Sequence, residues 1–141
     1  MASVFGHTFI SSVIASCGNK VYVKRTLLLC IILAVLPDID VIAFRFNIPY
    51  ESIWGHRGFT HSLFFSFITA SLCTKLFYPI WYKSVFTTLF LSGVSHSVLD
   101  ALTNGGLGVA FLFPLENSRY FFPWTPLEVS PVGIKNFFTE R

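Results

Sequence analysis

Long apolar segments alternate with short polar breaks along the chain, and this pattern predicts membrane-inserted helices. A helix needs about 20 mostly apolar residues to cross a bilayer. Three segments reach that length, whereas the first has fourteen residues and is expected to be tilted or re-entrant. Joined up and down, they predict an all-α, multi-pass membrane helical bundle that forms one domain over residues 1–141. The four segments are Val4–Cys17, Thr26–Phe46, Phe59–Tyr78 and Ser84–Thr103.

Proline and glycine positions predict where these helices break. Pro37 lacks a backbone donor and disfavours helix at the preceding residue, so the second helix should kink or stop near Leu36. A glycine, an asparagine and a lysine at 18–20 form a stop signal for the first helix. Thr60 is expected to cap the third helix. The tail from Leu107 to Arg141 is rich in aromatic residues and proline, which predicts an interfacial segment rather than a span.

Charge asymmetry predicts the orientation of the bundle. In an up-and-down arrangement, the loops around residues 18–25 and 79–83 lie on the same side. That side carries several cations and no acidic residue, so the positive-inside rule makes it cytoplasmic. The opposite end is then extracytoplasmic. The cations are Lys20, Lys24, Arg25, Lys75 and Lys83.

The composition supports a membrane protein and excludes several other classes. Hydrophobic residues make up 53% of the chain and charged residues 12%, about half the charged share of a soluble domain. The net charge of +3 comes from scattered cations, so no nucleic-acid partner is expected. Cys17, Cys30 and Cys73 are dispersed, which argues against disulfides and thiolate metal sites. The N-terminus has no basic region before its apolar run, so no removable signal peptide is expected.

The predicted topology gathers nearly all the distinctive polar chemistry at the extracytoplasmic end. Neutral imidazole and carboxylate groups are ligands of zinc and related divalent ions. We therefore predict a bound divalent metal, zinc first, with manganese or iron as alternatives. Seven candidate ligands exceed one tetrahedral ion, so both several metals and one metal with supporting carboxylates stay open. They include every histidine and aspartate of the chain: His7, Asp38, Asp40, His56, His61, His96 and Asp100.

Each part of this cluster has an ordinary explanation when taken alone. His96 and Asp100 share a helical face, but residues four apart often form only a hydrogen-bonded pair. The aspartates at 38 and 40 suit a cap or turn, and a histidine near the start of a short helix can be a satisfied polar residue. His56 and His61 would not share a helical face. A loop bent at the two nearby glycines would bring them together. The convergence of all seven favours the metal.

Arg57 is the candidate for anion binding. Glu51 is the only acidic residue near it in the sequence, so we expect its guanidinium to be free to bind phosphate bidentately. The alternative is a side chain that reaches the lipid headgroups. Hydroxyls of Thr60, Ser62 and Thr103 are expected either to support the ligands or to cap helices.

These motifs resemble the YdjM-like family of membrane-bound proteins, which are LexA-regulated in bacteria and described as metal-dependent hydrolases. The resemblance runs in order from residue 6 to about residue 133, and the block at residues 55–62 is its most specific part. The tail stretches Arg119–Trp124 and Val129–Pro131 resemble longer members. The matching motifs are Gly6-His7, Leu36-Pro37-Asp38-Ile39-Asp40, Gly55-His56-Arg57-Gly58-Phe59-Thr60-His61-Ser62 and Ser95-His96-x-x-x-Asp100-x-x-Thr103.

The resemblance implies a multi-pass inner-membrane protein with a hydrolase-type metal site. The family is in turn distantly similar to zinc-dependent phospholipase C and single-strand nuclease folds, which are helical and cleave phosphoesters. This similarity implies a class of reaction and not a substrate. Longer members continue with another apolar segment beyond the point where this sequence ends.

Two functional hypotheses follow. In the first, metal-activated water attacks a phosphoester or similar bond in a lipid-like substrate. Asp38 or Asp40, if not a ligand, would be the general base, and Arg57 would neutralise developing charge. In the second, the cluster binds divalent metal without catalysis, as a staple, a scaffold or a transport site. An open metal position beside Arg57 favours the enzyme. A metal conductor should carry acidic residues along its whole length, and the cytoplasmic half of this chain is expected to carry none.

Overall fold

The protein is built from helices in the computed structural model, which describes residues 2–18, 23–78, 80 and 82–129. Within this part of the chain there is no strand, and isolated bridges tie Thr103 to Leu127 and Val109 to Tyr120. The prediction of an all-α fold is therefore confirmed. The elements are α1 (Val4–Cys17), α2 (Val23–Val35), η1 (Leu36–Phe46), η2 (Phe59–His61), α3 (Leu63–Phe77) and α4 (Tyr82–Ala101), where η denotes a 3-10 helix.

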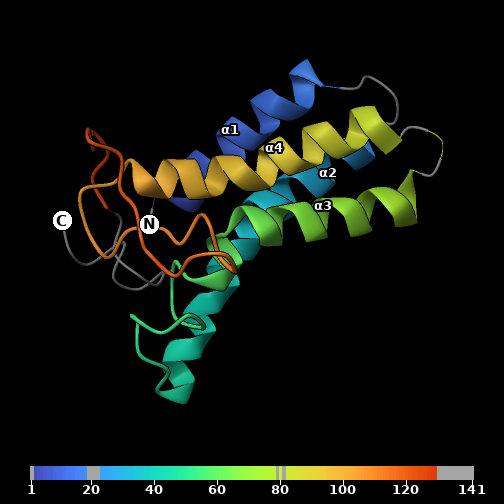
Figure 1. The fold of residues 1–141 in the computed structure, drawn as a ribbon. Coiled ribbons are helices and arrows are strands. Elements are labelled where there is room, and N and C mark those ends of the chain that lie inside the picture. The colour runs from blue at the N-terminus through green and yellow to red at the C-terminus, as the bar shows by residue number, and fades with distance from the viewer. Residues whose placement is uncertain (1, 19–22, 79, 81, 130–141) are drawn as a thin grey trace.

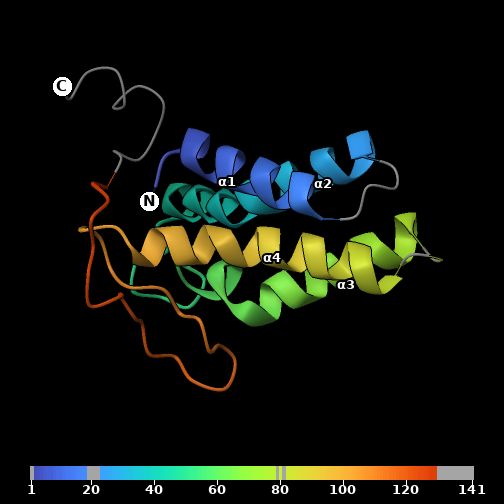
Figure 2. The same ribbon diagram turned by 90° about the horizontal axis from the view of Figure 1, so that it is seen from above.

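The four α-helices alternate in direction, as an up-and-down bundle requires (Figure 1). Helix α4 packs against each of the other three. Viewed from above, α1 and α2 lie on one side of the bundle, and α3 and α4 lie on the other (Figure 2). Helix η1 continues α2 obliquely beyond the bundle, and the loops of the C-terminal part gather at the same end (Figure 1).

The predicted helix breaks are largely confirmed. Helix α1 has the predicted bounds, and the backbone N–H of Gly18 donates to Ile14 O at 3.0 Å to end it. The asparagine and lysine of that stop signal lie outside the described residues. Helix α2 changes to the 3-10 helix η1 at Leu36, next to Pro37. The proline therefore tightens the helix at the predicted position, and the chain continues in helical turns to Phe46.

The predicted start of the third helix is wrong by four residues. Helix α3 begins at Leu63, and its cap is Ser62, whose Oγ accepts the backbone N–H of Phe65 at 3.0 Å. The Thr60 hydroxyl instead donates to Asp40 Oδ2 at 2.6 Å. A buried carboxylate takes the hydroxyl that the sequence suggested for a cap, and residues 59–61 form the separate turn η2.

Small and polar side chains fill the interior of the bundle. Ser92 of α4 shares a hydrogen bond with Ser11 of α1 at 2.8 Å and donates to the carbonyl of Cys30 in α2 at 2.8 Å. Large apolar side chains such as Phe5 face outward, with 75% of the residue exposed. This distribution is typical of helices packed in lipid, where small and hydroxyl residues join helices and large apolar residues face the lipid. Other exposed apolar residues are Phe9, Leu28, Phe67, Leu72 and Leu76.

One helical stretch within the described residues is long and apolar enough to cross a membrane. It runs over 24 residues from Val23 to Phe46 and comprises α2 and η1. Helices α1 and α3 are apolar but shorter. The multi-pass arrangement therefore stays a prediction.

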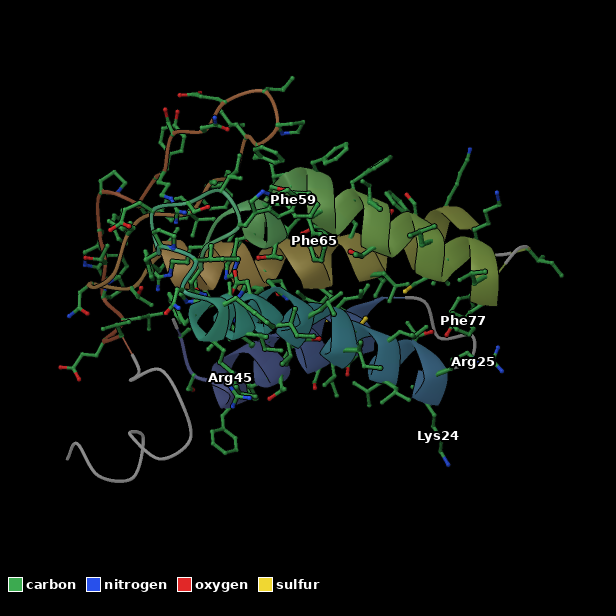
Figure 3. The ribbon with its side chains drawn as sticks, turned by 90° about the horizontal axis from the view of Figure 1, so that it is seen from below. Lys24, Arg25, Arg45, Phe59, Phe65 and Phe77 are labelled. Carbon is green, nitrogen blue, oxygen red and sulfur yellow. The ribbon has the colours of Figure 1, made fainter. Side chains whose placement is uncertain are left out.

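Cationic residues lie at both ends of the bundle. Lys24 and Arg25 lie with Phe77 at one end, whereas Arg45 lies at the other (Figure 3). The predicted gathering of cations at one end agrees with the placement of Lys24 and Arg25. Lys20 and the proline at residue 79 lie outside the described residues.

The Ser62 cap generates a first prediction. Replacing an N-cap serine by alanine leaves a backbone N–H without its partner, so Ser62→Ala should lower the unfolding free energy by about 1 kcal/mol. Denaturant titration of the protein in detergent would measure this. Ser16→Ala is the matched control, because Ser16 is exposed and donates within α1 to Ser12 O. Equal losses in the two variants would show that α3 does not depend on this cap.

Candidate metal centre

The structure brings all seven predicted ligand residues together at one end of the bundle. Their side chains are nearly inaccessible, with exposed fractions from 0% to 8%. The convergence expected from an up-and-down topology is thus observed, while the roles of the seven stay predictions. They come from the start of α1 (His7), from η1 (Asp38, Asp40), from the following loop (His56), from η2 (His61) and from the end of α4 (His96, Asp100).

The loop before η2 is bent as predicted. A Cβ on Gly55 would lie 2.3 Å from Pro49 O, and a Cβ on Gly58 would lie 2.2 Å from Ile53 O. Only glycine allows the backbone to fold so closely on itself. Between these glycines Arg57 has φ 64°, a left-handed conformation that is uncommon for a side-chain-bearing residue. The bend sets the ring of His56 at 5.3 Å from that of His61, measured between centroids.

Four side-chain atoms from three elements face one another at the centre of the cluster. His61 Nε2 lies 3.0 Å from His96 Nε2, 3.8 Å from Asp38 Oδ1 and 3.5 Å from Asp100 Oδ2. His96 Nε2 lies 3.4 Å from Asp38 Oδ1 and 3.9 Å from Asp100 Oδ2. Asp38, His61, His96 and Asp100 thus form a compact set with two nitrogen and two oxygen atoms, which we call the donor set.

Hydrogen bonds at the far side of each ring fix which imidazole nitrogen carries the proton. His96 Nδ1 lies 2.6 Å from the carbonyl oxygen of Ala34, which can only accept. His61 Nδ1 lies 3.1 Å from Thr60 Oγ1 and 3.2 Å from Asp40 Oδ2. Since the Thr60 hydroxyl donates to Asp40, both neighbours of His61 Nδ1 act as acceptors. Neutral His61 and His96 therefore carry their protons on Nδ1, and their Nε2 lone pairs point at each other.

Such an arrangement needs a positive charge, supplied either by a proton on one of the rings or by a bound cation. Two lone pairs and two carboxylate oxygens repel one another when nothing positive lies between them. Both buried carboxylate oxygens of Asp38 have no hydrogen-bond partner among the described residues. Tetrahedral ligands at zinc distances lie about 3.4 Å apart, close to the 3.0–3.9 Å separations of the five donor-set pairs that include a histidine. The donor set therefore fits a divalent ion, and its nitrogen and oxygen atoms also suit manganese or iron.

The remaining members of the cluster surround the donor set. Asp40 Oδ1 lies 2.7 Å from His56 Nδ1, and Asp40 with His56 and His61 forms a second compact group. His7 stacks on His96 with ring centroids 3.9 Å apart, and its Nε2 lies 3.5 Å from Asp100 Oδ1. Asp40, His56 and His7 therefore surround the donor set, and their contacts can orient its rings and carboxylates.

The electrostatics of the cluster bear most directly on His61. Burial lowers the pKa of this histidine, but its contacts with Asp100 and Asp40 outweigh burial and raise the pKa to about 9. The carboxylates therefore attract positive charge to the His61 ring. A divalent ion would compete with a proton for this position, because metal ligation requires a deprotonated nitrogen.

The expectation that the guanidinium of Arg57 is free to bind phosphate is wrong. Its Nε lies 3.2 Å from Asp100 Oδ2, and NH2 donates to Thr103 Oγ1 at 2.8 Å. NH1 donates to the carbonyls of Gly105 at 2.9 Å and Leu107 at 3.0 Å. Arg57 is fully buried, so its guanidinium is committed to the protein and is not free to clamp a phosphate. Its carboxylate partner is 43 residues away in sequence, and helix packing brings the two together.

Arg119 has a structural role that the residue pattern did not identify. Its NH1 donates to His56 O at 2.8 Å, and its NH2 donates to Tyr50 O at 3.1 Å and Ser52 O at 3.0 Å. The tail therefore holds the backbone of the loop between η1 and η2 (residues 47–58), which we call the metal-end loop. The sequence pointed to Arg119 only through the stretch Arg119–Trp124, which resembles longer members of the YdjM-like family.

Comparisons with known proteins identify relatives that are described as inner membrane proteins. The profile of the family described as YdjM inner membrane protein matches residues 1–140. The protein named "Inner membrane protein YbcI" from Escherichia coli (strain K12) is 43% identical over 126 residues, covering 86% of this chain and 72% of that protein. No solved structure gives a significant match.

The bent loop predicts a sharp contrast between two glycines. Gly55→Ala would force a methyl group into backbone carbonyls, which should destabilise the protein by about 1–3 kcal/mol. Gly6→Ala should be tolerated, because a Cβ there meets nothing closer than Ser3 Oγ at 3.7 Å. Denaturant titration of both variants in detergent gives the measurement. A stable Gly55→Ala protein would contradict the loop geometry.

The donor set predicts the metal content of its variants. His61→Ala, His96→Ala and Asp100→Ala should each lose bound divalent metal, because each removes one of four facing atoms. Elemental analysis of detergent-purified protein provides the measurement. Cys30→Ala is the control, since Cys30 is buried in the same bundle but lies outside the cluster. Wild-type metal content in all three variants would rule out a metal centre here.

Proposed function

This chain belongs to the YdjM inner membrane protein family, and on that premise we propose that it is a membrane-bound metal-dependent hydrolase. The substrate class is a phosphoester or similar bond in a lipid-like molecule. The observation that carries the proposal is the donor set, in which two imidazole lone pairs and two carboxylate oxygens face one another.

The donor set and its supports define what each residue would do. Asp38, His61, His96 and Asp100 would hold the ion, most simply one Zn²⁺. A bound divalent ion supplies Lewis acidity and lowers the pKa of water from 15.7 towards about 7. Asp100 is held in place by Arg57, and the His96 ring is oriented by the carbonyl of Ala34. Pre-orientation of this kind is what a catalytic metal site requires from its surroundings.

The bundle supports a bilayer-spanning arrangement of more than one helix. Its interior contains many small and hydroxyl residues beside a short apolar core, and many of its large apolar side chains face outward. With 20 residues, α4 has a length of about 30 Å, which equals the apolar thickness of a bilayer. We therefore propose a multi-pass topology with Lys24 and Arg25 on the cytoplasmic side. The metal centre then lies on the extracytoplasmic side, near the exposed Trp54 and Trp124 that suit the membrane interface.

A lipid-like substrate fits this location. The protein is associated with the bilayer as a member of an inner membrane family. The distant similarity of the family to helical phosphoesterase folds, which the motif resemblance implies, favours a phosphoester. A cationic group free to bind phosphate is not provided by Arg57, so the ion itself would be the principal positive charge for such a substrate.

The near-complete burial of the donor set favours one alternative, and so do its four protein ligands, because catalytic zinc sites have three and keep one position open. His61, His96 and Asp100 have fully buried side chains, which suits a structural ion that staples η1, η2 and α4 together. In that role the metal would stabilise the fold without turnover. The two functions differ in whether metal-loaded protein cleaves any ester.

The proposed orientation can be tested by cysteine labelling. In a variant with the three native cysteines replaced, Ser52→Cys should react with a membrane-impermeant maleimide added to intact cells. Ser84→Cys, at the basic end, should not react until the membrane is permeabilised. Position 19 would serve the same purpose as residue 84, but it lies outside the described residues. The reverse labelling pattern would invert the topology.

The proposed activity requires a direct assay. Purified, metal-loaded protein would be presented with phospholipids and with water-soluble phosphodiesters. Asp38→Asn should reduce turnover by about 10²-fold or more, since it removes a charged metal ligand. Glu51→Gln, which alters an exposed carboxylate at the same end, should leave turnover unchanged. If the metal-loaded wild type cleaves none of these esters, the stapling role is the correct one.

A further inference from the structure

Asp38 and Asp40 are two residues apart in η1, but their carboxylates have opposite surroundings. Both oxygens of Asp38 are buried and have no hydrogen-bond partner among the described residues. Both oxygens of Asp40 accept hydrogen bonds. Oδ1 accepts from His56 Nδ1 at 2.7 Å. Oδ2 accepts from Thr60 Oγ1 at 2.6 Å and from the backbone N–H of Arg57 at 3.2 Å, with His61 Nδ1 also at 3.2 Å.

This contrast separates a ligand from a supporting residue. A carboxylate that ligates a metal needs an oxygen lone pair directed at the ion, and Asp38 has both oxygens available. Asp40 is surrounded by donors that use its lone pairs. It also faces the Nδ1 atoms of two histidines, which is the side of each ring opposite Nε2. A carboxylate in that position fixes the tautomer and raises the basicity of the nitrogen that binds metal.

We propose that Asp40 is a positioning residue that orients His56 and His61 through their Nδ1 atoms, and is neither a metal ligand nor a general base. This inference rests on the proposed function, because it assigns a role within the proposed metal centre. It also places His56 outside the donor set. His56 Nε2 is buried and has no hydrogen-bond partner among the described residues, while its Nδ1 is held by Asp40.

The orientation extends to the backbone of the metal-end loop. The Asp40 carboxylate binds the N–H of Arg57, the residue with the left-handed backbone, as well as the rings on either side of it. One carboxylate therefore sets the loop conformation and two ring orientations together. Removal of its charge should loosen all three without removing an atom from the donor set.

The decisive experiment compares Asp38→Asn with Asp40→Asn, which make the same chemical change two residues apart. Titration of the metal-free protein with Zn²⁺ would give the affinity and the stoichiometry. Asp40→Asn should keep the wild-type stoichiometry with affinity lowered by about 10–100-fold, the usual effect of losing a supporting carboxylate. Asp38→Asn should lose stoichiometric binding, because it removes a ligand. Glu51→Gln is the matched control: it makes the same carboxylate-to-amide change at an exposed residue of the same end, so affinity should change by less than about 3-fold.

A second readout reports the ring orientation itself. The chain has four histidines, so their imidazole nitrogens can be assigned by ¹⁵N NMR with single His→Ala variants. In the metal-free wild type, His61 should be protonated at Nδ1, whether neutral or charged. In Asp40→Asn, neutral His61 should populate both tautomers, because the anionic acceptor at Nδ1 is gone. A residue that served only packing would leave this tautomer balance unchanged.

The outcomes separate this inference from the proposed function. If the wild type binds Zn²⁺ but Asp40→Asn loses it as completely as Asp38→Asn, Asp40 is a ligand and the inference is wrong. An unchanged affinity together with unchanged nitrogen shifts in Asp40→Asn would also overturn it. Failure of the wild type to bind any divalent ion would reject the metal centre itself. Loss of turnover alone would concern only the hydrolase.

Discussion

Three carboxylates buried at one end of an apolar bundle set the constraint on which this structure depends. Moving a carboxylate out of water costs several kcal/mol unless a positive charge or hydrogen bonds compensate. Asp40 is compensated by hydrogen-bond donors, and Asp100 in part by Arg57. Asp38 has no such partner. With the histidines neutral, as metal ligation requires, the three carboxylates and the buried guanidinium of Arg57 leave two negative charges, which one divalent ion would balance.

The same constraint explains the local geometry around the donor set. Each element there has a feature that an ordinary helix end lacks, such as a proline-led 3-10 helix, a left-handed arginine or a pair of crowded glycines. Such departures from local preference cost energy and persist where the surrounding structure enforces them. Here they all serve to place charged or polar side chains against one another, which is the pattern expected of a functional site.

Much of this arrangement could be predicted from the sequence. The apolar segments gave the helices, Pro37 gave the break, and alternating direction placed all seven histidines and aspartates at one end. These predictions depend on local chemistry and on topology. The partners of Arg57 and the role of Thr60 could not be predicted, because they depend on contacts between residues far apart in sequence. For the same reason, the sequence could not distinguish Asp38 from Asp40, which differ only in what surrounds them.

The two arginines of the metal end have a consequence for how the protein is made. Arg57 reaches from the loop to the carbonyls of Gly105 and Leu107, and Arg119 reaches from the tail to those of Tyr50, Ser52 and His56. Every candidate ligand has been synthesised once the ribosome passes Asp100. The loop at residues 47–58, which carries His56, lacks its Arg119 contacts until the tail arrives. The contacts around the candidate metal centre are therefore complete only after residue 119 has been translated.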